Sequence, residues 1–110
     1  MDLILVVCGA GASSTFLASR MRTLATERGL DLSVRPASTV DLASRLPGAS
    51  VLLVGPHLES SFTELAAQAA EHGVASALLP STAFGAQGAS DALDQALALL
   101  STTTEGTSHA

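Results

Sequence analysis

Hydrophobic residues follow two alternating patterns along this chain: short apolar runs, and stretches with helical spacing. Residues 3–7 and 51–54 are apolar at every position. Such runs are typical of central parallel strands, which are covered on both faces. Residues 30–35 alternate apolar and polar, and residues 75–79 are less apolar. The pattern therefore predicts four strands, two of them central and two at the edges of a sheet.

Helical spacing of apolar residues predicts a helix after each strand. The first helix is expected to begin near Ser14, with Ser13 or Ser14 as its cap, and to end at Gly29. Pro36 is expected to stop the second strand. The other helices are expected over residues 38–46, 62–72 and 90–100. The helix over residues 38–46 is expected to be capped by Ser38 or Thr39 and to pack through Val40, Leu42, Ala43 and Leu46.

Strands that alternate with helices predict an α/β fold with a parallel sheet and right-handed crossovers. With the two apolar strands in the centre, the strand order is 2-1-3-4, and helices cover both faces in a three-layer α/β/α arrangement. Ligands bind such sheets at the carboxyl ends of the strands, where the strand order reverses. Here that switch point lies between strands one and three. Residues 1–100 are predicted to form one domain, and the polar residues 101–110 a disordered tail.

The composition of the chain argues against several classes of function. The chain of 110 residues has a formal charge of −5, with five scattered arginines and no lysine, which argues against nucleic-acid binding. Its lone cysteine excludes an internal disulfide, and no apolar run is long enough for a membrane span. No signal peptide is expected, because Asp2, and no basic region, stands before the first apolar run. A cytoplasmic, monomeric protein without a cofactor is expected. No metal is expected either, because the sequence lacks the spacing of a metal-ligand motif.

The segment from Cys8 to Thr15 carries the candidate chemistry. A thiol stands at the end of the first strand, and the small residues Gly9, Ala10, Gly11 and Ala12 and the hydroxyl residues Ser13, Ser14 and Thr15 follow it. Backbone N–H groups in such a loop and at a helix N-terminus bind anions. The same groups lower the pKa of a nearby thiol. The segment is therefore interpreted as a nucleophilic Cys8 thiolate beside a phosphoryl-binding loop.

Two further loops are expected at the same edge of the sheet. One contains Gly55, Pro56, His57 and Leu58, and the other runs from Pro80 to Gly88 through Phe84 and Gly85. Leu58 and Phe84 are expected to give this rim an apolar docking surface for transient partners. His57 has two interpretations, a donor or acid/base group near the phosphate or a surface histidine without a role.

Three blocks of sequence resemble one family. They are the residues from Leu5 to Ser14, from Leu53 to His57, and Phe84, Gly85 and Gly88 before the last helix. Together they resemble the lactose/cellobiose/chitobiose-type enzyme IIB component of the bacterial sugar phosphotransferase system. The resemblance implies a transferase in which a phosphohistidine of enzyme IIA phosphorylates Cys8. Phosphocysteine then passes the group to a sugar that enters through enzyme IIC, so the protein would work transiently at the inner face of the membrane.

Two other classes of protein are alternatives to the phosphocarrier. A low-molecular-weight cysteine phosphatase or arsenate reductase has the same order of strand, loop and helix, but it needs an arginine six residues after the cysteine to clamp the phosphate. Ser14 occupies that position, and no second cysteine is present for a reductase cycle. The other alternative is a non-catalytic anion-binding regulatory domain. Phosphorylation of Cys8 by an enzyme IIA would favour the carrier over this domain.

Overall fold

The computed structural model describes residues 2–7, 11–80, 85 and 87–109, with the backbone alone for residues 11–14 and 101–109. Strands and helices alternate along the chain, as the sequence predicts. The elements are β1 (Asp2–Val7), α1 (Gly11–Glu27), β2 (Leu32–Ala37), α2 (Leu42–Arg45), β3 (Val51–Val54), the 3₁₀ helix η1 (Pro56–Ser61), α3 (Phe62–Glu71), β4 (Ala75–Leu78) and α4 (Gly88–His109).

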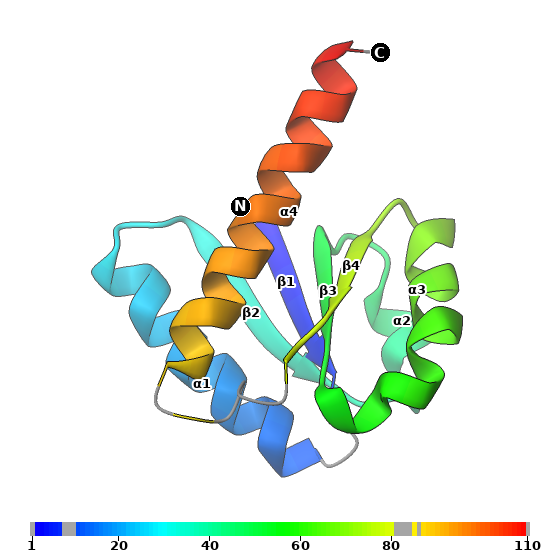
Figure 1. Cartoon of the computed structure of the whole chain (residues 1–110), viewed down its shortest axis with the longest axis horizontal. Helices are drawn as coiled ribbons and strands as arrows, with labels where there is room; N and C mark the ends of the chain where they lie inside the picture. Colours follow the sequence, from blue (N-terminus) through cyan, green and yellow to red (C-terminus); the bar gives the residue numbers. More distant parts are fainter. Residues whose placement is uncertain (1, 8–10, 81–84, 86, 110) are drawn as a thin grey trace.

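The four strands form one parallel sheet in the order β2-β1-β3-β4, which confirms the predicted topology. In its register, Val7 at the end of β1 lies beside Ala37 of β2 and Val54 of β3. Val54 in turn lies beside Leu78 of β4. All four strands therefore end at one edge of the sheet, the lower edge in Figure 1.

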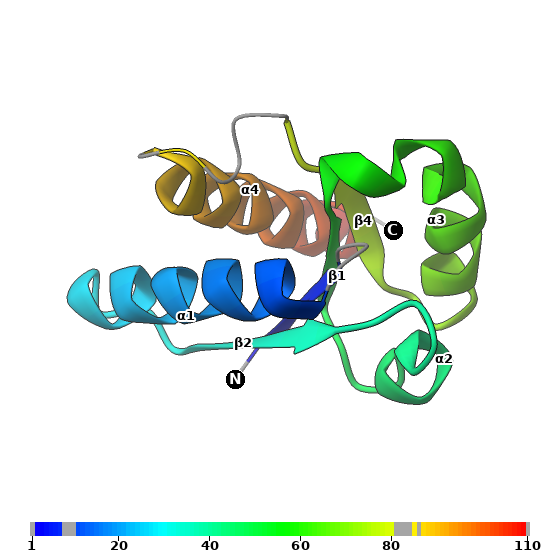
Figure 2. The same ribbon diagram turned by 90° about the horizontal axis from the view of Figure 1, so that it is seen from below.

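Helices cover both faces of the sheet, as predicted. Figure 2 shows α1 and α4 on one side and α2 and α3 on the other. Because side chains alternate along a strand, Ile4 and Val6 face the cluster under α1 and α4, whereas Leu5 and Val7 face the cluster under α2 and α3. Residues 51–54 divide in the same way and are all buried, which explains their unbroken apolar sequence.

Each edge strand has a carbonyl bound by a side chain from a neighbouring helix. Arg22 of α1 donates from Nη1 to the Val34 carbonyl of β2 at 3.0 Å, and Gln95 of α4 donates from Nε2 to the Leu78 carbonyl of β4 at 3.3 Å. Contrary to the sequence prediction, Pro36 does not stop β2 but lies inside it, opposite Val6. An edge strand tolerates proline, because the missing N–H has no partner strand on the outer side.

The first helix differs from its prediction at one end only. Gly29 has φ +71°, and the Leu30 N–H bonds the Ala25 carbonyl at 2.9 Å, so the helix ends at the predicted glycine. At the other end α1 begins at Gly11 rather than near Ser14. The apolar periodicity begins only at Leu17, the first buried side chain described in α1, and therefore does not report the turn before it.

The short helix α2 corrects two further expectations. Its N-terminal flanking residue is Asp41, not Ser38 or Thr39. Val40, which is 92% exposed, and Ala43, which is also exposed, do not pack as expected. The Asp41 carboxylate accepts hydrogen bonds from Arg45 Nε at 2.8 Å and from the Ser38 N–H at 2.9 Å. With a third bond from the Ser38 hydroxyl, these interactions lower the pKa of Asp41 to about 2. Leu42 and Leu46 are buried, as predicted.

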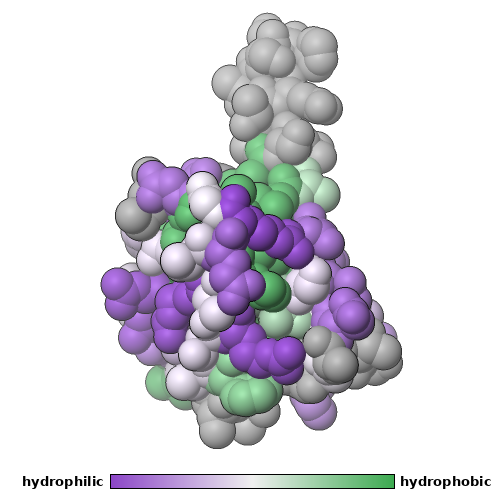
Figure 3. Space-filling model, turned by 90° about the vertical axis from the view of Figure 1, so that its left-hand side faces the viewer, coloured by the Kyte–Doolittle hydropathy of each residue, from purple (hydrophilic) through white to green (hydrophobic). Residues whose placement is uncertain are grey.

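The last helix is longer than its apolar pattern. Buried residues occupy its first turns, among them Ala89, Leu93 and Ala96, and Figure 3 shows hydrophobic surface where the helix leaves the body. The backbone of residues 101–109 continues the helix, whereas the sequence analysis expects a disordered tail there. Extending an existing helix requires no new nucleation, so polar residues can follow a packed segment in helical form. The extension leaves at the edge opposite the strand ends (Figure 1).

Candidate functional site

The carboxyl ends of the two central strands define the candidate site. β1 ends at Val7, and the Gly55 N–H donates to the Val7 carbonyl at 2.7 Å. The Leu79 N–H extends the ladder in the same way, to the Val54 carbonyl at 2.7 Å. These bonds fix the first residue after β3 beside the last residue of β1. The segment after Val7 therefore starts at the switch point that the topology predicts.

The start of α1 brings a helix N-terminus to the same edge. Between Val7, the end of β1, and Gly11, the start of α1, lie three residues, Cys8, Gly9 and Ala10, which are outside the described residues. The first four N–H groups of a helix have no partner within it, and the helix dipole adds positive potential there. Gly11, Ala12, Ser13 and Ser14 thus offer their N–H groups as part of the first turn of α1 rather than from a longer loop.

The predicted rim residues fall into two groups. Gly55, Pro56 and His57 lie directly after β3, with Gly55 buried and His57 exposed, and Gly85 is exposed before α4. Gly85 accepts a hydrogen bond from the Gly88 N–H at 3.0 Å. Phe84, the other predicted rim residue, lies outside the described residues.

Leu58 does not form the exposed apolar surface that the sequence analysis expects. It is half-buried and packs against the cluster under α2 and α3. The reason is the 3₁₀ helix η1, which was expected as an irregular loop: its first turn is closed by a bond from the Leu58 N–H to the Gly55 carbonyl at 3.0 Å. This turn directs Leu58 towards the core.

Phe16 is an exposed aromatic residue near the site that the sequence analysis missed. It lies in the second turn of α1 and is 56% exposed, and the Arg20 guanidinium carbon lies 5.7 Å from its ring centroid. A cation over an aromatic face at this distance is attracted by the ring. The signal was present in the sequence, since Phe16 falls outside the apolar stripe of Leu17, Met21 and Leu24.

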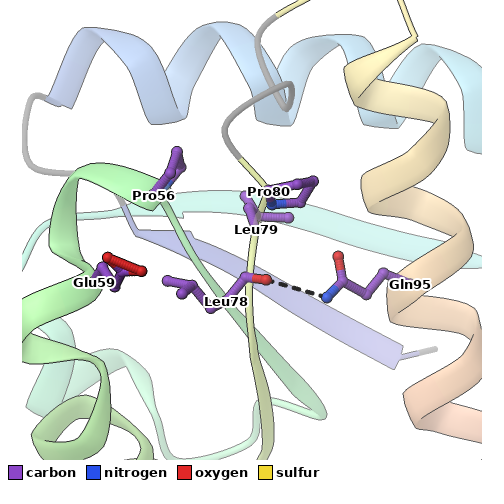
Figure 4. A pocket seen from close by; sticks show the side chains of 6 residues that line it. All are labelled: Pro56, Glu59, Leu78, Leu79, Pro80 and Gln95. Atoms are coloured by element: carbon purple, nitrogen blue, oxygen red, sulfur yellow. Dashed lines mark hydrogen bonds between the residues drawn. The ribbon is translucent and has the colours of Figure 1, made fainter.

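A pocket of about 630 Å³ opens beside the ends of β3 and β4. In Figure 4, Pro56 and Glu59 of η1 lie on one side of β4 and Gln95 of α4 lies on the other. Leu78, Leu79 and Pro80 from β4 and its end complete the lining. Glu59 is the only charged group among these lining residues. Sequence reasoning missed this pocket, because its residues are separated along the chain by up to 39 positions, from Pro56 to Gln95.

The described residues contain neither a metal-binding cluster nor a membrane-spanning helix. No group of three or more His, Cys, Asp or Glu side chains among them could hold a metal ion. In the same part of the chain, no helix has both the length and the apolar character needed to cross a membrane.

Comparison with known proteins identifies the family. Residues 3–82 match the family described as PTS system, Lactose/Cellobiose specific IIB subunit. The chain is 35% identical over 77 residues to the PTS system galactose-specific EIIB component of Lactococcus lactis subsp. cremoris. The aligned segment covers 66% of this chain and 71% of that protein. It is 34% identical, with the same coverage, to the cellobiose-specific EIIB component of Lactococcus lactis subsp. lactis.

Solved structures agree on the fold. The cellobiose-specific phosphotransferase IIB component of Borrelia burgdorferi has a TM-score of 0.75 at 20% identity, with 93% of this chain and 94% of that chain covered. The lactose-specific IIB component domain of Streptococcus pneumoniae has a TM-score of 0.69 at 13% identity, with 94% and 95% covered. The chain therefore belongs to the lactose/cellobiose-specific IIB family of the sugar phosphotransferase system. Components of this family are phosphotransferases.

Proposed function

We propose that the protein is a phosphocarrier that receives a phosphoryl group on Cys8 from a phosphohistidine of enzyme IIA. It passes the group to a sugar that enters through the membrane component, enzyme IIC. One observation carries this proposal: β1 ends one residue before Cys8, α1 begins three residues after it, and both lie at the switch point of the sheet. Family membership supports the same chemistry.

In the first step the Cys8 thiolate attacks phosphorus in line with the P–N bond of the phosphohistidine. The S–P bond forms, the P–N bond breaks, and the histidine nitrogen keeps the electron pair. In the second step a sugar hydroxyl oxygen attacks phosphorus, the S–P bond breaks, and the thiolate is regenerated as the hydroxyl proton is lost. Negative charge on the equatorial oxygens is stabilised by backbone N–H groups from Gly9 to Ser14, because the Thr15 N–H falls beyond the first four of α1.

The carrier must hold the phosphoryl group without losing it to water. A phosphatase of the cysteine type clamps the group with an arginine, but this chain has Ser14 at the required position. The N–H groups at the start of α1 bind the oxygens without supplying that clamp. A phosphocysteine held in this way is expected to persist until a second partner docks on the rim formed by Gly55, Pro56, His57, Phe84 and Gly85.

Phosphorylation in a reconstituted system tests the proposal. Phosphoenolpyruvate, the general phosphotransferase proteins and a matching enzyme IIA are expected to add one phosphate to the chain, measured by intact mass. Cys8→Ser is expected to abolish the addition, whereas His57→Ala is expected to retain it. Label on His57, or label that survives in Cys8→Ser, would show that the nucleophile is assigned wrongly. Absence of label from every enzyme IIA would favour an anion-binding domain.

A further inference from the structure

The charge of the molecule divides unequally along the chain. Residues 1–45 contain all five arginines and four acidic residues, whereas residues 46–110 contain six acidic residues and neither arginine nor lysine. The second part supplies β3, η1, α3, β4 and α4. Every residue that lines the pocket beside β4 comes from this acidic part. The part of the chain that supplies this lining therefore has a net negative charge, which favours cations over anions.

The lining of the pocket has two chemical parts. Its walls are apolar, formed by the two prolines and two leucines already named, and Leu79 is fully buried. Glu59 is exposed, and no arginine or histidine among the described residues forms an ion pair with its carboxylate. By contrast, Asp94 on the same α4 helix as Gln95 is paired with Arg28 at 2.7 Å. Among the residues that line the pocket, the Glu59 carboxylate is the acid that can bind an incoming cation.

A long basic side chain fits this combination. An arginine or lysine can lay its methylene stem along apolar walls while its charged end reaches a carboxylate at the rim. The Gln95 amide is already oriented by its bond to the Leu78 carbonyl, and its side-chain oxygen is an acceptor for a further N–H donor. Arginine suits the site better than lysine, because its planar group donates in several directions at once.

We propose that this pocket binds an arginine side chain from a cytoplasmic loop of the membrane component that receives the phosphoryl group. The inference rests on the proposed carrier function. Cytoplasmic loops of membrane proteins carry an excess of Lys and Arg, so the acceptor is the partner with the complementary charge. The phosphorylated donor presents an anion, which Glu59 repels. Pro56 follows Gly55, whose N–H bonds the last residue of β1, so a side chain in the pocket anchors a partner close to the end of that strand.

A ligand titration tests the pocket without any phosphoryl transfer. N-acetyl-arginine methylamide is added to the ¹⁵N-labelled chain, with the uncharged analogue N-acetyl-citrulline methylamide as the control. Arginine is expected to shift the Gln95 side-chain amide and the backbone amides of Glu59 and Leu79, and citrulline is expected to shift them less. Glu59→Gln is expected to weaken arginine binding about two- to fivefold, the range for an exposed ion pair. Glu64→Gln, an exposed acid on α3 outside the pocket, is the matched control and is expected to leave binding unchanged.

Transfer kinetics distinguish the membrane acceptor from the donor. Inverted membrane vesicles from the organism that carries this chain supply the acceptor. Glu59→Gln is expected to slow delivery to sugar and not to slow acceptance from enzyme IIA. Equal binding of arginine and citrulline, or slower acceptance with normal delivery, would overturn the proposal. If Cys8 takes no phosphate at all, the carrier function fails, and the arginine titration still decides whether the pocket binds a cation.

Discussion

Cys8 is the residue on which the proposed chemistry depends, and it is the only thiol in the chain. Its neighbours in sequence place it between the end of a strand and the start of a helix. The N–H groups of that helix start stabilise a thiolate more than a thiol. We therefore predict that the pKa of Cys8 lies below the value of about 8.5 of a free cysteine.

The rate of alkylation by iodoacetamide as a function of pH measures this pKa directly, because no second thiol contributes. The same chain unfolded in guanidinium chloride is the control and should react with an ordinary pKa. A folded-state pKa equal to or above the unfolded one would contradict the electrostatic argument.

Asp41 gives a second prediction at the residue scale. Its hydrogen bonds to Arg45 and Ser38 lower its pKa from 3.8 to about 2. The ionised form is thus favoured in the folded state, so its contribution to stability is present above the unfolded pKa. That contribution is lost as the pH falls from about 4 through about 2.

Carboxyl chemical shifts followed by NMR between pH 1.5 and about 6 measure the pKa of Asp41. Arg45→Gln removes the strongest of these hydrogen bonds and is expected to raise the pKa towards its ordinary value. An unchanged pKa in Arg45→Gln would show that Ser38 alone holds the carboxylate.

At the scale of elements, α2 shows which of its apolar residues stabilise the fold. Leu42 is fully buried, whereas Val40, two residues earlier, is 92% exposed. Leu42→Ala is expected to lower the free energy of unfolding by about 2–5 kcal/mol, because it removes buried methyl groups and leaves a cavity. Val40→Ala is the matched control and is expected to change it by less than about 0.5 kcal/mol. Urea unfolding of both variants measures the difference, and equal losses would place Val40 in the core.

At the scale of the whole molecule, the end of α4 is separated from the candidate site. The extension leaves at the edge opposite the strand ends, and the described core contacts of α4 lie before residue 101 (Figure 1). Removal of residues 101–110 is expected to leave both the melting temperature and phosphoryl acceptance nearly unchanged. Removal from residue 97 onwards also deletes leucines that pack against the core, and it is expected to lower the melting temperature. A large loss in the shorter truncation would show that the extension docks on the body.

The local pattern of apolar residues was sufficient to predict the strands of the sheet and their order. The apolar runs at residues 3–7 and 51–54 predicted two central strands. The sheet order follows from them because strands that are consecutive in sequence usually lie side by side, which leaves β2 outside β1 and β4 outside β3. Boundaries were less predictable. Pro36 remained in β2 because an edge strand has no partner on its outer side, and α1 began before its first described buried residue because capping and packing are separate signals.

The sequence by itself determined where chemistry is expected, because a thiol, small residues and hydroxyls stand in one continuous segment after an apolar strand. Family membership follows from the same continuity, since residues 3–82 match as one block. Only the tertiary structure decided which other side chains share that edge. It turned Leu58 inward and brought Glu59 and Gln95 to one pocket. The physical reason is that the burial of a side chain, and the choice of side chains that share a pocket, depend on how η1, β4 and α4 pack together. No local pattern records the distance between residues far apart in the chain.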